Sequence, residues 1–275
     1  MSEFYNKTRR SASIPAKLMR EGKWYLLPVY YFMLTSYLAR EGVANSGSYQ
    51  FADHIYANQP RGSFFVGKIL DAILLNLKSA RSMRARYLHA KKEIRNLLPS
   101  IGHDGPIDIL SVPSGLAREF FETADELEGI AHPQYPRIRW HGIDLDPHLI
   151  DILNAKKDQY RHPMHFIVGD AFDTDIYEGC EHYDMIICTG FTEFLDDERT
   201  LCIYKIAYDH LKRNGSFYTS GMTSHRLSDY LLKNLAELYT HYRSEAELRD
   251  LACRAGFEHI HTYRDELQTI LIGRK

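Results

Sequence analysis

Residues 107–117 have the sequence IDILSVPSGLA, an apolar run that ends in small, turn-forming residues. This run and three similar ones occur in the last two-thirds of the chain: Ile107–Val112 before Pro113, Ile138–Ile143 before Asp144, His165–Val168 before Gly169-Asp170, and Asp184–Cys188 before Thr189-Gly190. Amphipathic, helix-like sequence follows the first, second and fourth runs. The phasing predicts successive βα units of an open parallel sheet, in which ligands bind beyond the carboxyl ends of the strands.

A joint rich in helix-breaking residues, PSIGHDGP at 99–106, separates two kinds of sequence. The sequence before the joint is typical of helices. After it, the βα alternation continues to a fifth strand and then to a predicted terminal hairpin. We therefore predict an N-terminal helical region over residues 1–98 and an α/β domain over residues 99–275.

Two segments of the helical region are strongly apolar. Trp24–Leu38 is too short to span a bilayer and contains Pro28 and several tyrosines, so we expect a buried or lid helix. Peripheral contact with a lipid-like substrate is the open alternative. In Ser63–Leu77 the apolar residues that share one helix face are Phe65, Ile69, Ile73 and Leu77.

The overall composition is that of a globular protein, with 44% apolar and 25% charged residues. The net charge of −2 provides no global field that would attract nucleic acid. Four cysteines without CxxC spacing, and an N-terminus without the apolar core of a signal peptide, indicate a reducing, cytoplasmic setting. The fourteen histidines form no standard zinc spacing, so we expect no metal site.

Small residues after the first run are suited to hold a ligand through the backbone. A strand that turns sharply into a helix directs N–H groups and the positive helix end at the ligand, and small residues allow close approach. Ser114, Gly115 and Ala117 meet that need, whereas Pro113 fixes one turn dihedral and donates no N–H. A plain strand-to-helix turn is the alternative.

Two aspartates follow the second and third runs. Asp144 is placed to accept hydrogen bonds from both hydroxyls of a ribose. Asp170 can accept from an exocyclic amine such as adenine N6, while the Ala171 N–H reaches a ring nitrogen. A helix-cap or turn role is the alternative for Asp170. These residues predict a nucleoside-shaped site, and Thr189 and Gly190 would form its floor.

In combination, these features resemble the class I S-adenosylmethionine-dependent methyltransferases over roughly residues 90–275. The matching motifs are SVPSGLA, Asp144, Gly169-Asp170, Tyr183-Asp184-Met185-Ile186, Asn214-Gly215 and Ala255-Gly256-Phe257. The family's first motif is usually acidic-x-Gly-x-Gly-x-Gly, and those places here hold Ser111, Pro113, Gly115 and Ala117. Only the central glycine is retained, so the amino-acid part of the cofactor must be held differently.

The resemblance implies a Rossmann-like three-layer αβα sandwich. Its sheet would be mostly parallel and seven-stranded, with a C-terminal antiparallel hairpin. It also implies S-adenosyl-L-methionine as the cofactor. The residues expected to bind it are Ser111, Pro113, Ser114, Gly115, Asp144, Leu145, Asp170, Ala171, Thr189 and Gly190. Arg118, Tyr49 and Arg61 are further candidates for contacts to its carboxylate.

In this family the acceptor pocket is usually covered by a variable N-terminal segment and by inserts after the fourth and fifth strands. Those places here are Asn45–Arg61, Phe191–Phe194 and Met222–Tyr230. The residues proposed for catalysis are Tyr49, His54 and Glu193. The aromatic content of the N-terminal region favours a small organic acceptor, apolar or aromatic. We expect no nucleic-acid partner and no membrane span, and a homodimer is left open.

Two other functions remain open at this stage. The enzyme could transfer another part of the cofactor, such as its aminocarboxypropyl group. The fold could also serve as a non-catalytic binding module. A nicotinamide dehydrogenase is disfavoured because the sequence lacks GxGxxG.

Overall fold

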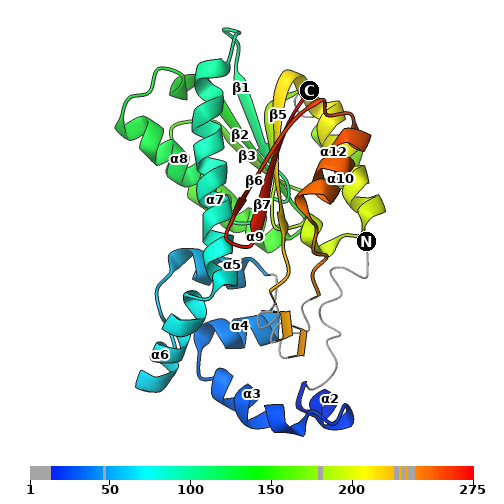
Figure 1. Ribbon diagram of the computed structural model, residues 1–275. Coiled ribbons are helices and arrows are strands. Elements are labelled where there is room, and N and C mark those ends of the chain that lie inside the picture. Colours follow the sequence, from blue (N-terminus) through cyan, green and yellow to red (C-terminus); the bar gives the residue numbers. More distant parts are fainter. Residues whose placement is uncertain (1–13, 46–47, 179–181, 226–228, 231–232, 235–238) are drawn as a thin grey trace. The chain divides into compact units, whose positions relative to one another are not determined.

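The computed structural model describes residues 14–45, 48–178, 182–225, 229–230, 233–234 and 239–275. The chain forms two compact units (Figure 1). Unit 1 comprises residues 1–84 and 224–240, and unit 2 comprises residues 85–223 and 241–275. Some residues considered above lie outside the described ones: the N-terminal residues 1–13, Cys180, and residues 46–47 and 226–228 of the predicted acceptor segments.

Unit 2 contains one seven-stranded sheet with the strand order β3-β2-β1-β4-β5-β7-β6. The strands are β1 (Ile107–Ser111), β2 (Ile138–Asp144), β3 (Met164–Val168), β4 (Tyr183–Cys188), β5 (Leu211–Met222), β6 (His259–Asp265) and β7 (Gln268–Arg274). The first five strands are parallel, and β7 is antiparallel to both β5 and β6. The predicted fold class, including the terminal hairpin, is confirmed.

Helices cover both faces of the sheet (Figure 1). The helical elements of unit 2 after β1 are α8 (Arg118–Gly129), η4 (Tyr135–Arg137), α9 (Pro147–Lys157), η5 (Thr174–Tyr177), η6 (Thr192–Phe194), α10 (Asp197–His210) and α12 (Glu245–Ala255). Helix α9 begins at Pro147 because the Asp146 side chain accepts from the N–H groups of His148 and Leu149. Helix α12 begins with a capping box formed by Ser244 and Glu247.

The division between the units falls inside helix α7 (Lys78–Leu97), after Arg84, and not at the joint of residues 99–106. The later turns of α7 belong to unit 2 because they are tied to α8, for example by the 2.8 Å ion pair of Lys91 with Glu122. The joint, which includes the short turn η3 (Leu98–Ser100), leads the chain from α7 into β1.

Unit 1 is helical, as predicted. Its elements before α7 are α2 (Ile14–Arg20), η2 (Trp24–Leu26), α3 (Leu27–Met33), α4 (Tyr37–Asn45), α5 (Tyr49–Ala57) and α6 (Phe64–Leu75). The buried carboxylate of Asp71 joins several of them. It accepts hydrogen bonds from the Ser36 hydroxyl, from the Leu38 and Arg61 N–H groups at 2.7 Å each, and from His54 Nε2 at 2.7 Å.

Two apolar segments of unit 1 expose much of their apolar surface. The helix indicated by the spacing forms as α6, and its apolar stripe of Phe65, Ile69 and Ile73 is exposed. The residues that α6 buries instead are Gly67, Asp71, Leu74 and Leu75. The four donors around Asp71 fix that face inward. The segment Trp24–Leu38, expected to be a buried or lid helix, is divided among η2, α3 and the start of α4, and most of its aromatic residues are exposed rather than buried. None of the described helices is long and apolar enough to cross a membrane.

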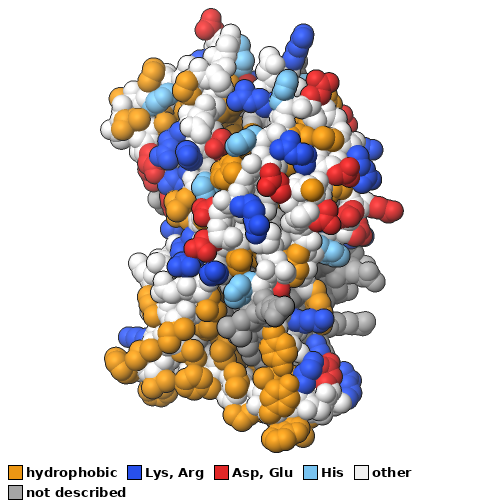
Figure 2. Space-filling model, in the orientation of Figure 1, with side chains coloured by type: hydrophobic (Ala, Val, Ile, Leu, Met, Phe, Trp, Pro, Cys, Tyr) orange, Lys and Arg blue, Asp and Glu red, His pale blue; other side chains and the backbone are white. Residues whose placement is uncertain are grey.

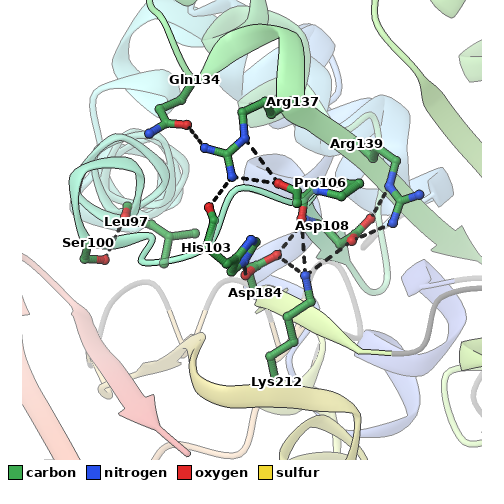
Figure 3. Close-up of polar contacts among 11 residues, drawn as sticks. Leu97, Ser100, His103, Pro106, Asp108, Gln134, Arg137, Arg139, Asp184 and Lys212 are labelled. Atoms are coloured by element: carbon green, nitrogen blue, oxygen red, sulfur yellow. Dashed lines mark hydrogen bonds and ion pairs between the residues drawn. The ribbon is translucent and has the colours of Figure 1, made fainter.

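Charged residues occupy the second position of four neighbouring strands, at the amino edge of the sheet (Figure 3). Arg139 binds both carboxylate oxygens of Asp108 at 2.7 Å, and Lys212 Nζ lies 2.7 Å from Asp184 Oδ2. The same oxygen of Asp184 accepts the Asp108 N–H at 2.8 Å. Opposite charges are therefore matched across β2, β1, β4 and β5.

Substituting Asp184→Ala tests this network. We expect the free energy of unfolding to fall by about 3 kcal/mol, because the buried Asp108 N–H loses its acceptor, Lys212 loses the nearer of its two carboxylate partners and His103 loses its own. Urea unfolding followed by the fluorescence of Trp140, which is buried in β2, measures the change. The control is Asp250→Ala, which removes an exposed pair with Arg254 and should cost less than about 0.5 kcal/mol. Equal losses would contradict the assignment.

Candidate functional site

The carboxyl ends of β3, β2, β1 and β4 lie in a row at the opposite edge of the sheet. Direct hydrogen bonds join the turns that follow them. The Ser114 N–H donates to the Ile143 carbonyl at 2.8 Å, and the Gly169 N–H donates to the Asp144 carbonyl at 2.9 Å. The sheet therefore brings together the predicted residues that follow these strands.

The turn after β1 leaves room for a ligand. Gly115 has a φ of +49°, and a Cβ added there would meet no atom within 4 Å. Ala117 also adopts a left-handed conformation just before α8 begins. The Gly115 backbone thus faces open space at the N-terminal end of a helix, as the binding of a polar ligand by backbone groups requires.

The carboxylate of Asp144 connects the ends of β1 and β2. Its Oδ2 accepts the Gly115 N–H at 3.0 Å, and its Oδ1 accepts the Asp146 N–H at 3.1 Å. Burial raises the pKa of Asp144, although these amides oppose the shift. Each carboxylate oxygen keeps further acceptor capacity, so the group can accept from two adjacent hydroxyls. Leu145 lies beside it and is half-buried.

The loop after β3 carries Asp170 and Ala171. Asp170 Oδ1 accepts the Phe172 N–H at 3.1 Å, which is the turn role that the sequence left open. A carboxylate with one such bond can still accept others. The carbonyl of Ala171 accepts a hydrogen bond from the hydroxyl of buried Tyr177 at 2.7 Å, which fixes the position of this loop.

A buried carboxylate that we did not predict lies at the end of β1. Glu119, the second residue of α8, accepts the Ser111 hydroxyl at 2.9 Å through its Oε1. The resemblance implies an acidic residue at the position of Ser111, and here the carboxylate of Glu119 from α8 lies beside that serine. The available sequence signal was an acidic residue in the first turn of the helix after β1.

A buried arginine, also unpredicted, reaches the turn after β4. Arg86, from α7, lies so close to Gly190 that a Cβ there would be 2.4 Å from Arg86 Nη2. Gly190 has a φ of +72°, so both its conformation and its packing require glycine. Arg86 Nη1 lies 3.4 Å from Glu193 Oε1.

Glu193 lies in the turn η6 and is only 3% exposed. The Arg243 guanidinium donates to the carbonyls of Thr192 and Leu195 at 2.8 and 2.7 Å, which fixes the turn η6. The Ser220 hydroxyl lies 3.5 Å from Glu193 Oε1. No described residue gives Glu193 Oε2 a hydrogen-bond partner.

Burial dominates the electrostatics of this cluster. Burial raises the pKa of Glu119 and of Glu193, and the positive charge of Arg86 opposes both shifts. Arg243 also opposes the shift of Glu193, but the pKa of both carboxyl groups stays raised. An ionised pair would be stabilised by a cationic ligand, which is the property expected of a binding site.

The three residues proposed for catalysis are divided between the units. Glu193 lies in unit 2, with the residues predicted to bind the cofactor. Tyr49 and His54 belong to unit 1, where Tyr49 begins α5 and His54 is buried against Asp71. Their catalytic role stays a prediction. Among the described residues, no group of three His, Cys, Asp or Glu side chains could hold a metal ion.

The strand order and the row of polar turns define a Rossmann-like fold of the methyltransferase type. The chain belongs to the family described as "Putative methyltransferase", whose sequence model matches residues 37–272. No curated protein matches the sequence.

Solved structures share this fold at low sequence identity. A possible exported protein from Bordetella parapertussis is 19% identical, with 98% of each chain covered and a TM-score of 0.75. Magnesium protoporphyrin IX methyltransferase from Synechocystis PCC 6803, solved with bound SAH, is 14% identical over 72% of this chain and 87% of its own, with a TM-score of 0.50. The CMeT domain of the citrinin polyketide synthase is 15% identical over 96% and 70%, with a TM-score of 0.56. Together with the family match, they confirm the resemblance to class I methyltransferases.

The contributions of two α8 glutamates to the stability of the fold should change with pH in opposite directions. The folded-state pKa of Glu119 is raised, so its ionisation costs stability as the pH rises above the unfolded value of about 4.3. For Glu122, burial is outweighed by Lys91 and Arg118, and its lowered pKa adds stability above that pH. We therefore expect Glu119→Gln to raise the thermal unfolding midpoint more at pH 8 than at pH 4.

The matched control is Glu122→Gln, which should lower the midpoint more at pH 8 than at pH 4. Thermal unfolding of both variants and the wild type across this range measures the difference. Parallel pH profiles for the two variants would show that Glu119 carries no uncompensated charge.

Proposed function

We propose that the protein is an S-adenosylmethionine-dependent methyltransferase that acts on a small organic acceptor. One observation carries the proposal. The buried carboxylate of Asp144 is joined to the Gly115 N–H across the ends of β2 and β1, in the fold that this family shares. The SAH bound to the Synechocystis enzyme supports the choice of cofactor. The free cysteines Cys188, Cys202 and Cys253 agree with a cytoplasmic setting, which belongs to the same proposal.

The residues at the carboxyl edge fit the parts of this cofactor. Asp144 would accept from the ribose hydroxyls, and Asp170 with the Ala171 N–H would bind the adenine. The cofactor carries two positive charges, on its ammonium and its sulfonium, and one carboxylate. Glu119 and Glu193 are suited to the cations, and Arg86 is suited to the carboxylate. Glu193 Oε2, which has no hydrogen-bond partner within the described part of the chain, supports this arrangement.

When bound, the cofactor supplies a methyl group on an electrophilic sulfonium. The protein's own contribution is to orient the acceptor and to exclude water, which lowers the barrier by several kcal/mol at least. Glu193 Oε2 can take a proton from an acceptor O–H or N–H, because its raised pKa makes the carboxylate a stronger base. The catalytic role of Tyr49 and His54, both in unit 1, stays a prediction from the sequence.

Asp144→Ala tests cofactor binding. We expect the Kd for S-adenosylmethionine to rise about 100-fold, because two charge-assisted hydrogen bonds are lost at about 1.5 kcal/mol each. Titration calorimetry with the cofactor and with S-adenosylhomocysteine provides the measurement. The control is Asp146→Ala, two residues later, which removes only the cap of α9 and should leave Kd nearly unchanged. If the wild-type protein bound neither ligand, the proposal would be wrong and a non-catalytic binding module would be the remaining function.

Glu193→Gln tests the charge of the reaction centre. The sulfonium distinguishes S-adenosylmethionine from the neutral thioether of S-adenosylhomocysteine, while both carry the ammonium. We expect the Kd for S-adenosylmethionine, divided by the Kd for S-adenosylhomocysteine, to be about five- to tenfold higher in the variant than in the wild type. This is the effect of losing one partly screened charge pair of about 1 kcal/mol. Asp196→Asn, the cap of α10, is the control. An unchanged ratio of the two Kd values would place Glu193 away from the sulfonium.

A further inference from the structure

Unit 1 exposes a cluster of large apolar side chains that neither its cores nor the proposed chemistry uses. We name it the aromatic face and define it by Trp24, Tyr31, Phe32, Phe64, Phe65 and Ile69. Figure 2 shows hydrophobic side chains gathered over α3 and α6. Phe65 is 78% exposed and Trp24 65%, which is unusual for such residues.

The contributions of α3 and α6 form one surface. The end of α3 and the start of α6 are joined by the Ser63 N–H, which donates to the Thr35 carbonyl at 2.9 Å, and by the bridge between Ser36 and Gly62. Gly67 lies against the same Thr35 carbonyl. The exposed side chains at the end of α3 and in the first turns of α6 are therefore neighbours.

The charge of the chain is divided unevenly between the units. Residues 1–84 carry 12 Lys and Arg against 5 Asp and Glu, and residues 224–240 carry 2 of each kind. The rest of the chain carries 20 against 29, so unit 1 is basic and unit 2 is acidic. On the aromatic face itself, α3 has no acidic residue, the only one in α6 is buried Asp71, and Lys68 is exposed.

An apolar centre within a basic unit fits an anionic lipid surface. Trp and Tyr are favoured at the membrane–water interface, aliphatic side chains enter the acyl boundary, and Lys and Arg attract anionic headgroups. A second copy of the chain fits less well, because a symmetric contact would bring two basic units together. We propose that unit 1 binds the surface of an anionic lipid bilayer through the aromatic face, without spanning it.

The two tryptophans make the test direct. Trp24 lies in the aromatic face, whereas Trp140 is fully buried in β2 and gives a constant background. The full-length protein is titrated with vesicles of phosphatidylcholine containing 30% phosphatidylglycerol, and with phosphatidylcholine alone. We expect a blue shift of the emission and quenching by brominated acyl chains with the anionic vesicles, and much weaker binding to the neutral ones. The Trp24→Phe variant should lose the spectral change but still sediment with the vesicles.

Surface variants test which residues bind. Phe65→Ser combined with Ile69→Ser should weaken vesicle binding at least tenfold, and Lys68→Gln about fivefold, the effect of one basic residue near an anionic surface. Ile130→Ser, at a residue 70% exposed in unit 2, is the matched control and should bind as the wild type does. Because these side chains are exposed, circular dichroism should show folded protein.

Three results would overturn the proposal: no binding of the wild type to anionic vesicles, equal binding by the double variant, or a lipid-free dimer that the double variant dissociates in sedimentation. The last result would show that a second copy covers the face. None of these measurements uses the cofactor, so their outcome is independent of the proposed methyl transfer.

Discussion

One buried guanidinium organises the carboxyl edge of the sheet. Arg86 faces Glu193 directly and acts electrostatically on Glu119, and burying either carboxylate without a cation would be costly. The backbone of Arg86 is fixed as well, because its carbonyl accepts the hydroxyl of buried Tyr218 from β5 at 2.9 Å. Helix α7 is thereby tied to β5, to the turn after β4 and to the electrostatics of α8. The requirement for glycine at position 190 follows from the same guanidinium.

The buried carboxylates at the two edges of the sheet are paired with cations in different ways. At the amino edge, Asp108 and Asp184 are paired with Arg139 and Lys212, so each buried carboxylate has a cation of its own. At the carboxyl edge, Glu193 lies 3.4 Å from Arg86, which also acts on Glu119, and an oxygen of Glu193 has no partner among the described residues. A purely structural network would be expected to resemble the first edge. The incomplete pairing at the second edge supports the proposal that a cationic ligand binds there.

The sequence was sufficient for the sheet and for part of the site. Strands buried on both faces are recognisable as short apolar runs, and the ends of neighbouring parallel strands must meet, so the position of Asp144 beside the first turn could be predicted. Arg86 could not, because it reaches the site from α7 through tertiary packing that no local spacing records. Glu119 had only a weak signal, an acidic residue in the first turn of the helix after β1. The stripe of α6 shows a related limit. Apolar periodicity identified the helix, but the hydrogen bonds of Asp71 determine which face is buried.

The net charge of the whole chain does not show that the two units carry opposite net charges. A value of −2 is the sum of a basic unit and an acidic unit, so the absence of a global field does not describe either surface. Aromatic and basic residues together also occur where proteins bind single-stranded nucleic acid, by stacking of bases and pairing with phosphates. The surface around the aromatic face differs from such a site, because α6 also exposes the aliphatic side chains of Val66, Ile69 and Ile73, which offer no ring for stacking. Lys68 is the only basic residue of α6. Aliphatic side chains around exposed rings match the boundary between headgroups and acyl chains, so a lipid surface is the better fit.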